Sequence, residues 1–268
     1  MTPLAITGIG VCATGMGSWT QAQSVLRSHE SPALAPLPRL APDCLPPVER
    51  RRANATTRLA ISAAMQAIEG MLPDDVARMP TVFSSSDGDG EVLANMLAAL
   101  AQQQVLLSPT LFHNSVFNAP AGYWSIGSRS RAASITVSAG PASFVAGLKE
   151  AHGQVLATGA PVLYVAYESP FPAALASFAR STEPFACALR LAPVAPLGAN
   201  GFGRIEALRP GADQVEQVAG PHADLLRCFA GSAAADALPL LCAIARRRRA
   251  RIALPAIDGT LQWLDYLP

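Results

Sequence analysis

The sequence has little charge for its length, and this shortage excludes two classes of protein. Only 15% of its 268 residues are charged and 50% are hydrophobic, which excludes an intrinsically disordered chain. The formal net charge is +1, so the chain lacks the strong positive field of a general nucleic-acid-binding protein. A surface with so little charge is typical of a protein that is partly covered by another subunit.

Paired cysteines and long apolar runs are also missing. The cysteines form no CxxC pair and have no adjacent histidine; they are Cys12, Cys44, Cys187, Cys228 and Cys242. Such scattered thiols predict a reduced, cytoplasmic protein. No stretch has the roughly 18 uncharged apolar residues of a membrane helix. Residues 1–11 lack the basic region and apolar run of a signal peptide, so we expect neither export nor a transmembrane segment.

Short apolar runs alternate with segments of helical period along most of the chain, which predicts the α/β class. The expected strands cover 4–11, 81–83, 134–137, 162–167, 186–191 and 202–208. The expected helices cover 18–26, 57–71, 91–105, 144–156, 223–229 and 235–248. Two stretches rich in proline, 31–47 and 108–127, are expected to be irregular. Asp258-Gly259 between two alternating runs predicts a final hairpin.

No cofactor or metal motif is complete. Residues 8–13 fit G-x-G-x-x-A, but no helix starts inside the motif and the acidic residue expected about 20 positions later is missing. The acidic run 87–91 lacks the further oxygen ligands of a calcium loop, so it favours a strand-to-helix turn. The four histidines include no pair at i,i+4, which disfavours zinc. We therefore expect no cofactor and no metal.

Two serines are the remaining candidate nucleophiles. Ser138 and Ser143 flank the turn formed by Ala139, Gly140, Pro141 and Ala142. A serine nucleophile needs a base within hydrogen-bond reach, and His113 is the plausible one. A stand-alone serine-dependent acyl transferase or decarboxylase that acts on acyl-carrier protein therefore stays open as an alternative.

Arginines gather in two clusters, which are Arg50, Arg51 and Arg52, and Arg246, Arg247, Arg248 and Arg249. The second cluster ends an apolar helix, where positive charge is favourable to the helix dipole. A docking patch for an acidic partner is the functional alternative. No aromatic residues interleave the arginines, which disfavours nucleic acid as the partner.

Several segments, taken in order, resemble a β-ketoacyl synthase of the thiolase-like class. They are Ile6-Thr7-Gly8-Ile9-Gly10-Val11, the run Ser134-Ile135-Thr136-Val137-Ser138-Ala139, the helix 144–159 and the strand 161–168. A closer resemblance is to the short, chain-length-factor-like proteins of bacterial aryl-polyene and related pigment clusters. Segments 45–52, 108–112, 138–144 and 162–167 contribute to it, and Asn114-Ser115-Val116-Phe117-Asn118-Ala119-Pro120-Ala121-Gly122 is its most specific part. The resemblance covers about residues 1–191.

The resemblance implies a subunit without independent activity. An active synthase carries a cysteine at the turn between the third strand and its helix, where the helix dipole lowers the thiol pKa and amides hold an oxyanion. Here that turn runs from Ser138 to Ser143 without a cysteine, and the later His-Gly-Thr-Gly-Thr and Gly-Phe-Gly-Gly motifs are absent. The implied fold is α/β and thiolase-like, a mixed sheet flanked by helices with a truncated second half. Residues 1–192 would form the synthase-like half, and 193–268 a reduced portion packed on the same core.

The implied partner is an active β-ketoacyl-acyl-carrier-protein synthase in a heterodimer, with the acyl carrier protein contacted indirectly. The third strands would pair across the interface, which covers an otherwise bare edge. Residues expected at the tunnel or interface are Phe112, Asn114, Val116, Phe117, Asn118, Tyr123, Trp124, Ile135 and Val137. Ordinary core packing is the alternative for each of them, and both arginine clusters are candidate carrier-protein docking sites. A purely structural stabiliser with no influence on chain length stays open as a second alternative.

Overall fold

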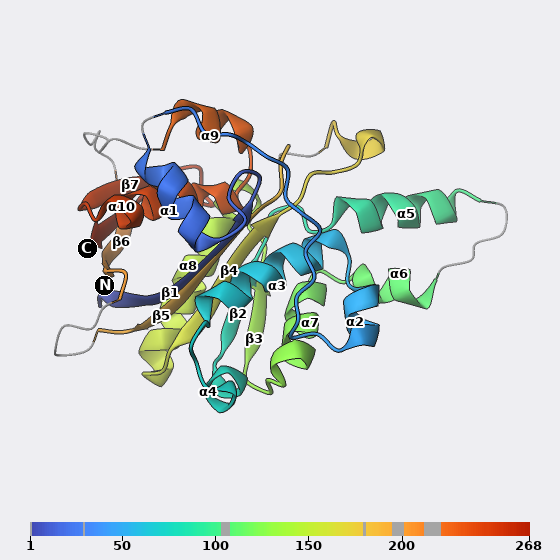
Figure 1. Ribbon diagram of the computed structural model, residues 1–268, viewed down its shortest axis with the longest axis horizontal. Helices are drawn as coiled ribbons and strands as arrows, with labels where there is room; N and C mark the ends of the chain where they lie inside the picture. Colours follow the sequence, from blue (N-terminus) through green and yellow to red (C-terminus); the bar gives the residue numbers. More distant parts are fainter. Residues whose placement is uncertain (1, 29, 103–107, 179–180, 195–200, 212–220) are drawn as a thin grey trace.

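The computed structural model describes residues 2–28, 30–102, 108–178, 181–194, 201–211 and 221–268 (Figure 1). Within them the strands form one mixed sheet in the order β3-β2-β4-β5-β1-β6-β8-β7. Their bounds are β1 (Leu4–Ala13), β2 (Thr81–Ser84), β3 (Ser134–Val137), β4 (Val162–Glu168), β5 (Phe185–Pro193), β6 (Arg204–Gly211), β7 (Ala250–Pro255) and β8 (Leu261–Leu267). Strand β2 runs parallel to β3 and β4, and the other neighbours are antiparallel.

Helices cover both faces of this sheet. The helices are α1 (Trp19–Arg27), α2 (Pro47–Arg52), α3 (Ala55–Ala67), α4 (Pro73–Arg78), α5 (Gly90–Leu100), α6 (Pro109–Asn114), α7 (Ala119–Ser128), α8 (Ser143–Thr158), α9 (Ala223–Cys228) and α10 (Leu238–Arg246). One hydrophobic core joins α1, α8 and α10 to the sheet, and a second core joins α3 and α7 to it. Helices α5 and α6 extend from the body at the β3 end (Figure 1). We call these two helices the arm.

The six expected strands and the final hairpin are confirmed to within a few residues. Helix α1 starts as expected at Ser18, whose side chain accepts a hydrogen bond from the amide of Gln21. The expectation of an irregular stretch at 108–127 is wrong, because α6 and α7 lie there. Pro109 and Pro120 occupy the first turns of these helices, where proline needs no amide partner, so they start helices instead of interrupting them.

The glycines near the N-terminus serve packing. Helix α3 lies so close to β1 that a Cβ on Gly8 would be 2.0 Å from the carbonyl oxygen of Ala67. On Gly10 it would be 1.9 Å from the carbonyl oxygen of Ala63. Side chains at either position would push the helix off the strand, so the G-x-G pattern marks a helix–strand contact rather than a dinucleotide loop.

The described C-terminal residues continue the same sheet. Strand β6 pairs with β1 through Leu4 and Ile205, and β8 and β7 follow in order. Leu225 and Leu241, from α9 and α10, lie in the core that contains β1. The division of the chain after residue 192 stays a prediction.

Candidate functional site

The turn between β3 and α8 is open to solvent space at Gly140. Gly140 has φ 53°, in the left-handed region, and a Cβ built on it would meet no atom within 4 Å. Helix α8 starts three residues later, so the positive end of its dipole faces this turn. The turn therefore combines the positive end of a helix dipole with free space at Gly140, which no side chain of its own fills.

Ser143 holds the turn together. Its hydroxyl donates to the carbonyl oxygen of Gly140 at 2.7 Å and accepts from the amide of Ala139 at 2.9 Å. The residue is buried. Because both bonds lie within the turn, this hydroxyl closes the loop and is not directed at a substrate.

Ser138 is exposed and donates to the carbonyl oxygen of Ser86 at 3.2 Å. His113, its expected base, lies on α6 with its ring 5.5 Å from the ring of Tyr123. His152 bonds to the carbonyl oxygen of Thr2, and His222 accepts from the amide of Asp224. Among the described residues neither serine has a histidine partner, so the structure gives the serine-dependent alternative no base.

Burial disfavours the thiolate form of all five cysteines. Burial raises the pKa of Cys12 to about 12 and that of Cys44 to about 11. Burial also raises the pKa of Cys187, Cys228 and Cys242. A thiolate nucleophile needs a lowered pKa, so none of the five has the required environment.

A buried carboxyl group lies between the turn and the arm. Glu168 ends β4, and its carboxylate accepts from the hydroxyl of Ser85 at 3.1 Å and from the amide of Ser86. Burial, with Asp87 nearby, raises the pKa of Glu168 to about 7. The same Ser85 hydroxyl accepts from the amide of Gly88 at 2.9 Å, so Glu168 fixes the loop that leads into α5.

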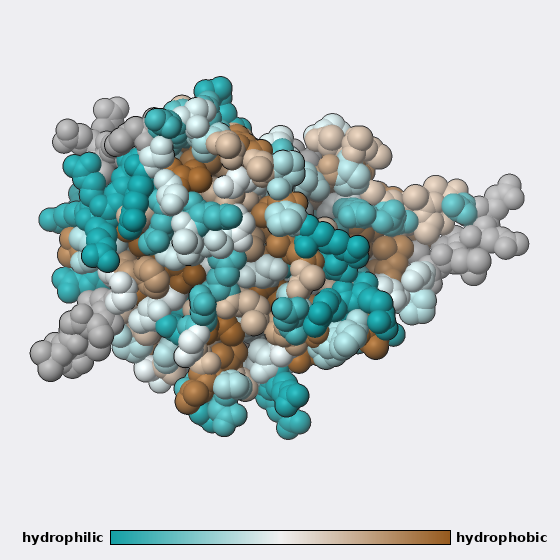
Figure 2. Space-filling model, viewed as in Figure 1, coloured by the Kyte–Doolittle hydropathy of each residue, from teal (hydrophilic) through white to brown (hydrophobic). Residues whose placement is uncertain are grey.

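Exposed apolar side chains gather at this end of the molecule. They come from the arm, from the link to α7, from α7 and from β3, and are Leu93, Leu97, Leu100, Phe112, Val116, Phe117, Ile126 and Ile135. In Figure 2 apolar surface is visible around the base of the arm, while hydrophilic residues cover the α10 end. We call these eight residues the apolar surface.

The residues expected at the tunnel or interface divide into two groups. Phe112 is 62% exposed, Val116, Phe117, Asn118 and Ile135 are also exposed, and Val137 is half-buried. The other three are buried. Tyr123 and Trp124 are 0% and 1% exposed and pack in the core that contains α3, as the core-packing alternative expects. Their place at a tunnel wall stays a prediction. The side-chain amide of the buried Asn114 donates to the carbonyl oxygen of Arg52 at 2.9 Å, and its oxygen accepts from the hydroxyl of Tyr123 at 3.0 Å.

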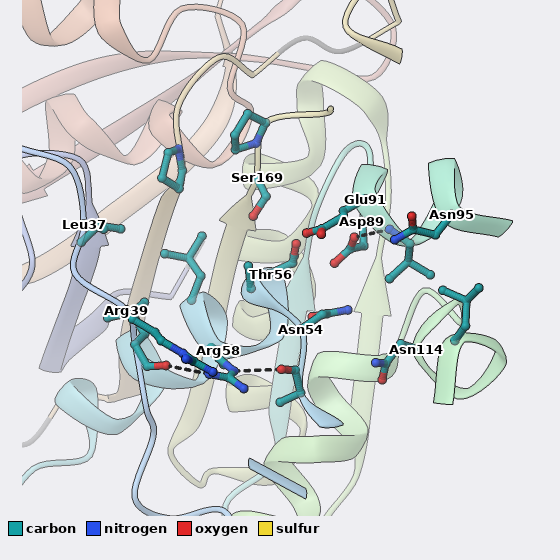
Figure 3. A pocket seen from close by; sticks show the side chains of 18 of the residues that line it. Leu37, Arg39, Asn54, Thr56, Arg58, Asp89, Glu91, Asn95, Asn114 and Ser169 are labelled. Carbon is teal, nitrogen blue, oxygen red and sulfur yellow. Dashed lines mark hydrogen bonds between the residues drawn. The ribbon is translucent and has the colours of Figure 1, made fainter. Parts of the chain in front are cut away.

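A cavity of about 800 Å³ separates the base of the arm from the proline-rich stretch 31–47. Figure 3 shows Arg39 and Arg58 on one side of it and Asp89 and Glu91 on the other. The Arg58 guanidinium donates hydrogen bonds of 2.7 to 3.4 Å to the carbonyl oxygens of Leu40, Arg50 and Ala53. Residues of the turn do not line this cavity, so it provides no path to Ser138 or Ser143.

The arginine clusters lie on different parts of the molecule. Arg50 pairs with Asp43 at 3.3 Å and Arg52 with Glu49 at 3.3 Å, while Arg51 is exposed on α2. Arg247, Arg248 and Arg249 are exposed at the end of α10, and Arg246 donates to the carbonyl oxygen of Leu26 at 2.8 Å. Helix α2 is close to the arm, whereas α10 lies at the opposite end (Figure 1).

The described ranges contain no group of three or more histidine, cysteine, aspartate or glutamate side chains able to hold a metal ion. Of the helices that the structure describes, none combines the length and the apolar character needed to cross a bilayer.

Comparisons with known proteins agree with this architecture. The family model for the N-terminal domain of β-ketoacyl synthases matches residues 18–217. A complex of the ketosynthase ApeO with its chain length factor ApeC from Xenorhabdus doucetiae contains a chain that is 23% identical, with a TM-score of 0.73 and 99% and 100% of the two chains covered. The ishigamide ketosynthase/chain length factor gives 14% identity, a TM-score of 0.77 and 99% coverage of both chains. No curated protein sequence matches the chain.

A third solved structure, AntDE:AntF, is a type II polyketide acyl-carrier protein in complex with its ketosynthase. Its matched chain is 12% identical, with a TM-score of 0.73 and 99% of each chain covered. At such identities the likeness shows the fold. The expected fold, a thiolase-like mixed sheet flanked by helices, is therefore confirmed.

Proposed function

Because the chain belongs to the β-ketoacyl synthase N-terminal domain family, we propose that it is a chain-length-factor-like subunit. It pairs with an active β-ketoacyl-acyl-carrier-protein synthase, has no turnover of its own and shapes the partner's acyl tunnel. The chemistry belongs to aryl-polyene or polyketide-type assembly. The solved relatives support the pairing by analogy, since two of them contain a chain length factor with its ketosynthase.

One observation carries this proposal: the apolar surface lies around an open sheet edge at β3, beside a turn that contains no cysteine. Among the strands that the structure describes, β3 pairs with β2 alone. The carbonyl oxygens of Ala133 and Val137 accept hydrogen bonds at 3.0 and 3.3 Å from the amides of Thr81, in β2, and of Ser85, which follows it. Because backbone groups alternate along a strand, those of Ser134 and Thr136 face outward and are free to pair with a strand of another subunit.

The arm gives this interface a second function. When two β3 strands pair, side chains of the arm and of the following link stand close to the partner, since both project at the same end of the sheet (Figure 1). Phe112, Val116 and Phe117 are exposed there and are apolar, as the wall of an acyl tunnel must be. Their size then limits how far the partner's product can grow.

The carrier protein is bound mainly by the synthase, and this chain adds charge at the rim. Arg51 on α2 is the best placed contributor, because it is exposed close to the arm. The four arginines that end α10 lie at the other end, and we assign them a smaller part in carrier-protein docking.

Co-expression with the active synthase from the same gene cluster tests the function. The two chains should co-elute in size exclusion, and the synthase should make products of defined length only when this chain is present. A covalent acyl group on the purified chain alone would contradict the proposal, as would full activity and unchanged products from the synthase without it.

A further inference from the structure

The arm is attached to the body of the molecule at few points. In α5 only Gly90 and Val92 are buried, and in α6 only Asn114. The rest of both helices projects beyond the body (Figure 1). A helix held mainly at its first turn takes its direction from the contacts of that turn.

The first turn of α5 rests against Phe171. A Cβ built on Gly90 would lie 2.1 Å from Cδ1, 2.4 Å from Cγ and 2.7 Å from Cε1 of that ring. Ordinary carbon–carbon contacts are about 3.5–4 Å, so only a glycine allows this approach. Cγ is the atom that attaches the ring, so rotation of the ring does not relieve the clash, and either the Phe171 side chain or the helix must move.

The segment 167–171, which we call the seat, holds the arm at more than one place. Tyr167 donates to the carbonyl oxygen of Phe117 at 3.5 Å, and Glu168 fixes the loop that carries Gly88. The Phe117 ring also lies against Gly88, where a Cβ would be 3.3 Å from Cδ2. Phe171 is the third residue of the seat that contacts this region, and its ring lies against Gly90. One short segment thus contacts the start of α5 and the link that follows α6.

We propose that the contact between Phe171 and Gly90 positions the arm and thereby helps to set product length. This inference rests on the proposed function, because it acts through the exposed side chains of the arm. Both are positioning residues. A larger residue at Gly90 moves the arm away from the seat and toward a partner that is paired at β3, so the partner's acyl tunnel becomes narrower. Loss of the Phe171 ring allows the arm to move toward the body, so the same tunnel becomes wider.

The test uses the heterodimer of this chain with its synthase and three variants: Gly90→Ala, Phe171→Ala and the double variant. We expect shorter products from Gly90→Ala, longer or more varied products from Phe171→Ala, and partial return to the original length in the double variant, because the new methyl group occupies space that the ring left. Gly153→Ala in α8 is the matched control, since a Cβ there meets nothing within 4 Å, and it should leave product length unchanged.

A second measurement needs no partner. Amide hydrogen exchange in α5 of the isolated chain should be faster in Gly90→Ala and in Phe171→Ala than in the original chain or in Gly153→Ala. Phe171→Leu, a milder change, covers the case in which the alanine variant does not fold, and it should shift exchange and product length in the same direction but less. Unchanged α5 exchange, or unchanged product length in an intact complex, overturns the inference. Altered α5 exchange in a chain that never pairs with the synthase supports the seat and contradicts the proposed function instead.

Discussion

The two edges of the sheet are built in opposite ways. At the β7 edge Arg251 pairs with Asp265 of β8 at 2.5 Å, and the strand ends in Pro255. Charged side chains and proline on an edge strand discourage pairing with another chain. The β3 edge has no charge and no proline, and its Ile135 is 41% exposed. The comparison teaches that association is prevented at one end and left open at the other.

The exposed side chains near the two edges also differ, with the apolar surface near β3 and arginines near β7. Close to β3 the exposed side chains include those of the apolar surface, and the arm extends beyond the body with little of its surface buried. Near β7 the exposed side chains include the arginines that end α10. An apolar surface this concentrated is characteristic of a protein–protein interface, whereas a charged end keeps a complex soluble.

The largest expected effect comes from a charge placed on the open edge. Ile135→Asp should weaken the heterodimer by about 100-fold or more, because an unpaired carboxylate buried in an interface costs about 3 kcal/mol or more. Titration calorimetry or size exclusion measures the loss. Ile257→Asp is the matched control, since Ile257 is 76% exposed in the hairpin at the other end, and it should leave affinity unchanged. Equal loss in both variants would remove the distinction between the edges.

The contributions of Glu168, near the arm, and of Asp265, in β8, to the stability of the chain should change with pH in opposite directions. Burial raises the pKa of Glu168 from 4.5 to about 7, so the unfolded chain binds fewer protons than the folded one between these values. Its contribution therefore makes the chain less stable as pH rises from about 4.5 to 7, by up to about 3 kcal/mol. Asp265 loses some charge stabilisation to burial, but Arg251 and Arg209 lower its pKa overall, and its contribution is lost as pH falls through that lowered pKa.

Glu168→Gln isolates the first of these effects. The variant should be more stable than the original chain at pH 8 and similar at pH 4.5, with unfolding followed by denaturant at each pH. Some slope should remain, because burial also raises the pKa of Asp236 to about 7. A pH profile identical to that of the original chain would show that Glu168 is not held in an environment that disfavours its charge.

A smaller effect is expected from the arm itself. Phe112→Ala should lengthen or broaden the products while the complex survives, because a side chain that is 62% exposed contributes little to folding. Leu72→Ala serves as the control, since Leu72 is also exposed but lies at the start of α4 and outside the apolar surface. Unchanged product lengths with both variants in an intact complex would support the purely structural stabiliser.

Some of this site could be predicted from the sequence, for identifiable reasons. That the turn from Ser138 to Ser143 contains no cysteine is a matter of residue identity, and β3 is a short apolar strand between turns, so both could be read from the sequence. The burial of Tyr123 and Trp124 could not be predicted, because it depends on which side of α7 meets α3, and 108–127 was expected to be irregular. The contact of Gly90 with Phe171 joins residues 81 positions apart, which no local pattern encodes.

The smallest expected effect concerns the carrier protein. Arg51→Glu should weaken its binding to the heterodimer by a few-fold, because a charge at an interface rim contributes about 1 kcal/mol or less. The double variant Arg248→Glu/Arg249→Glu reverses more charge at the opposite end, and should change the affinity less. Affinity measured at low and high salt checks both, since a rim contact weakens with ionic strength. If the double variant has the larger effect, the carrier protein approaches over α10, and the β7 end is then an interface despite its closed edge.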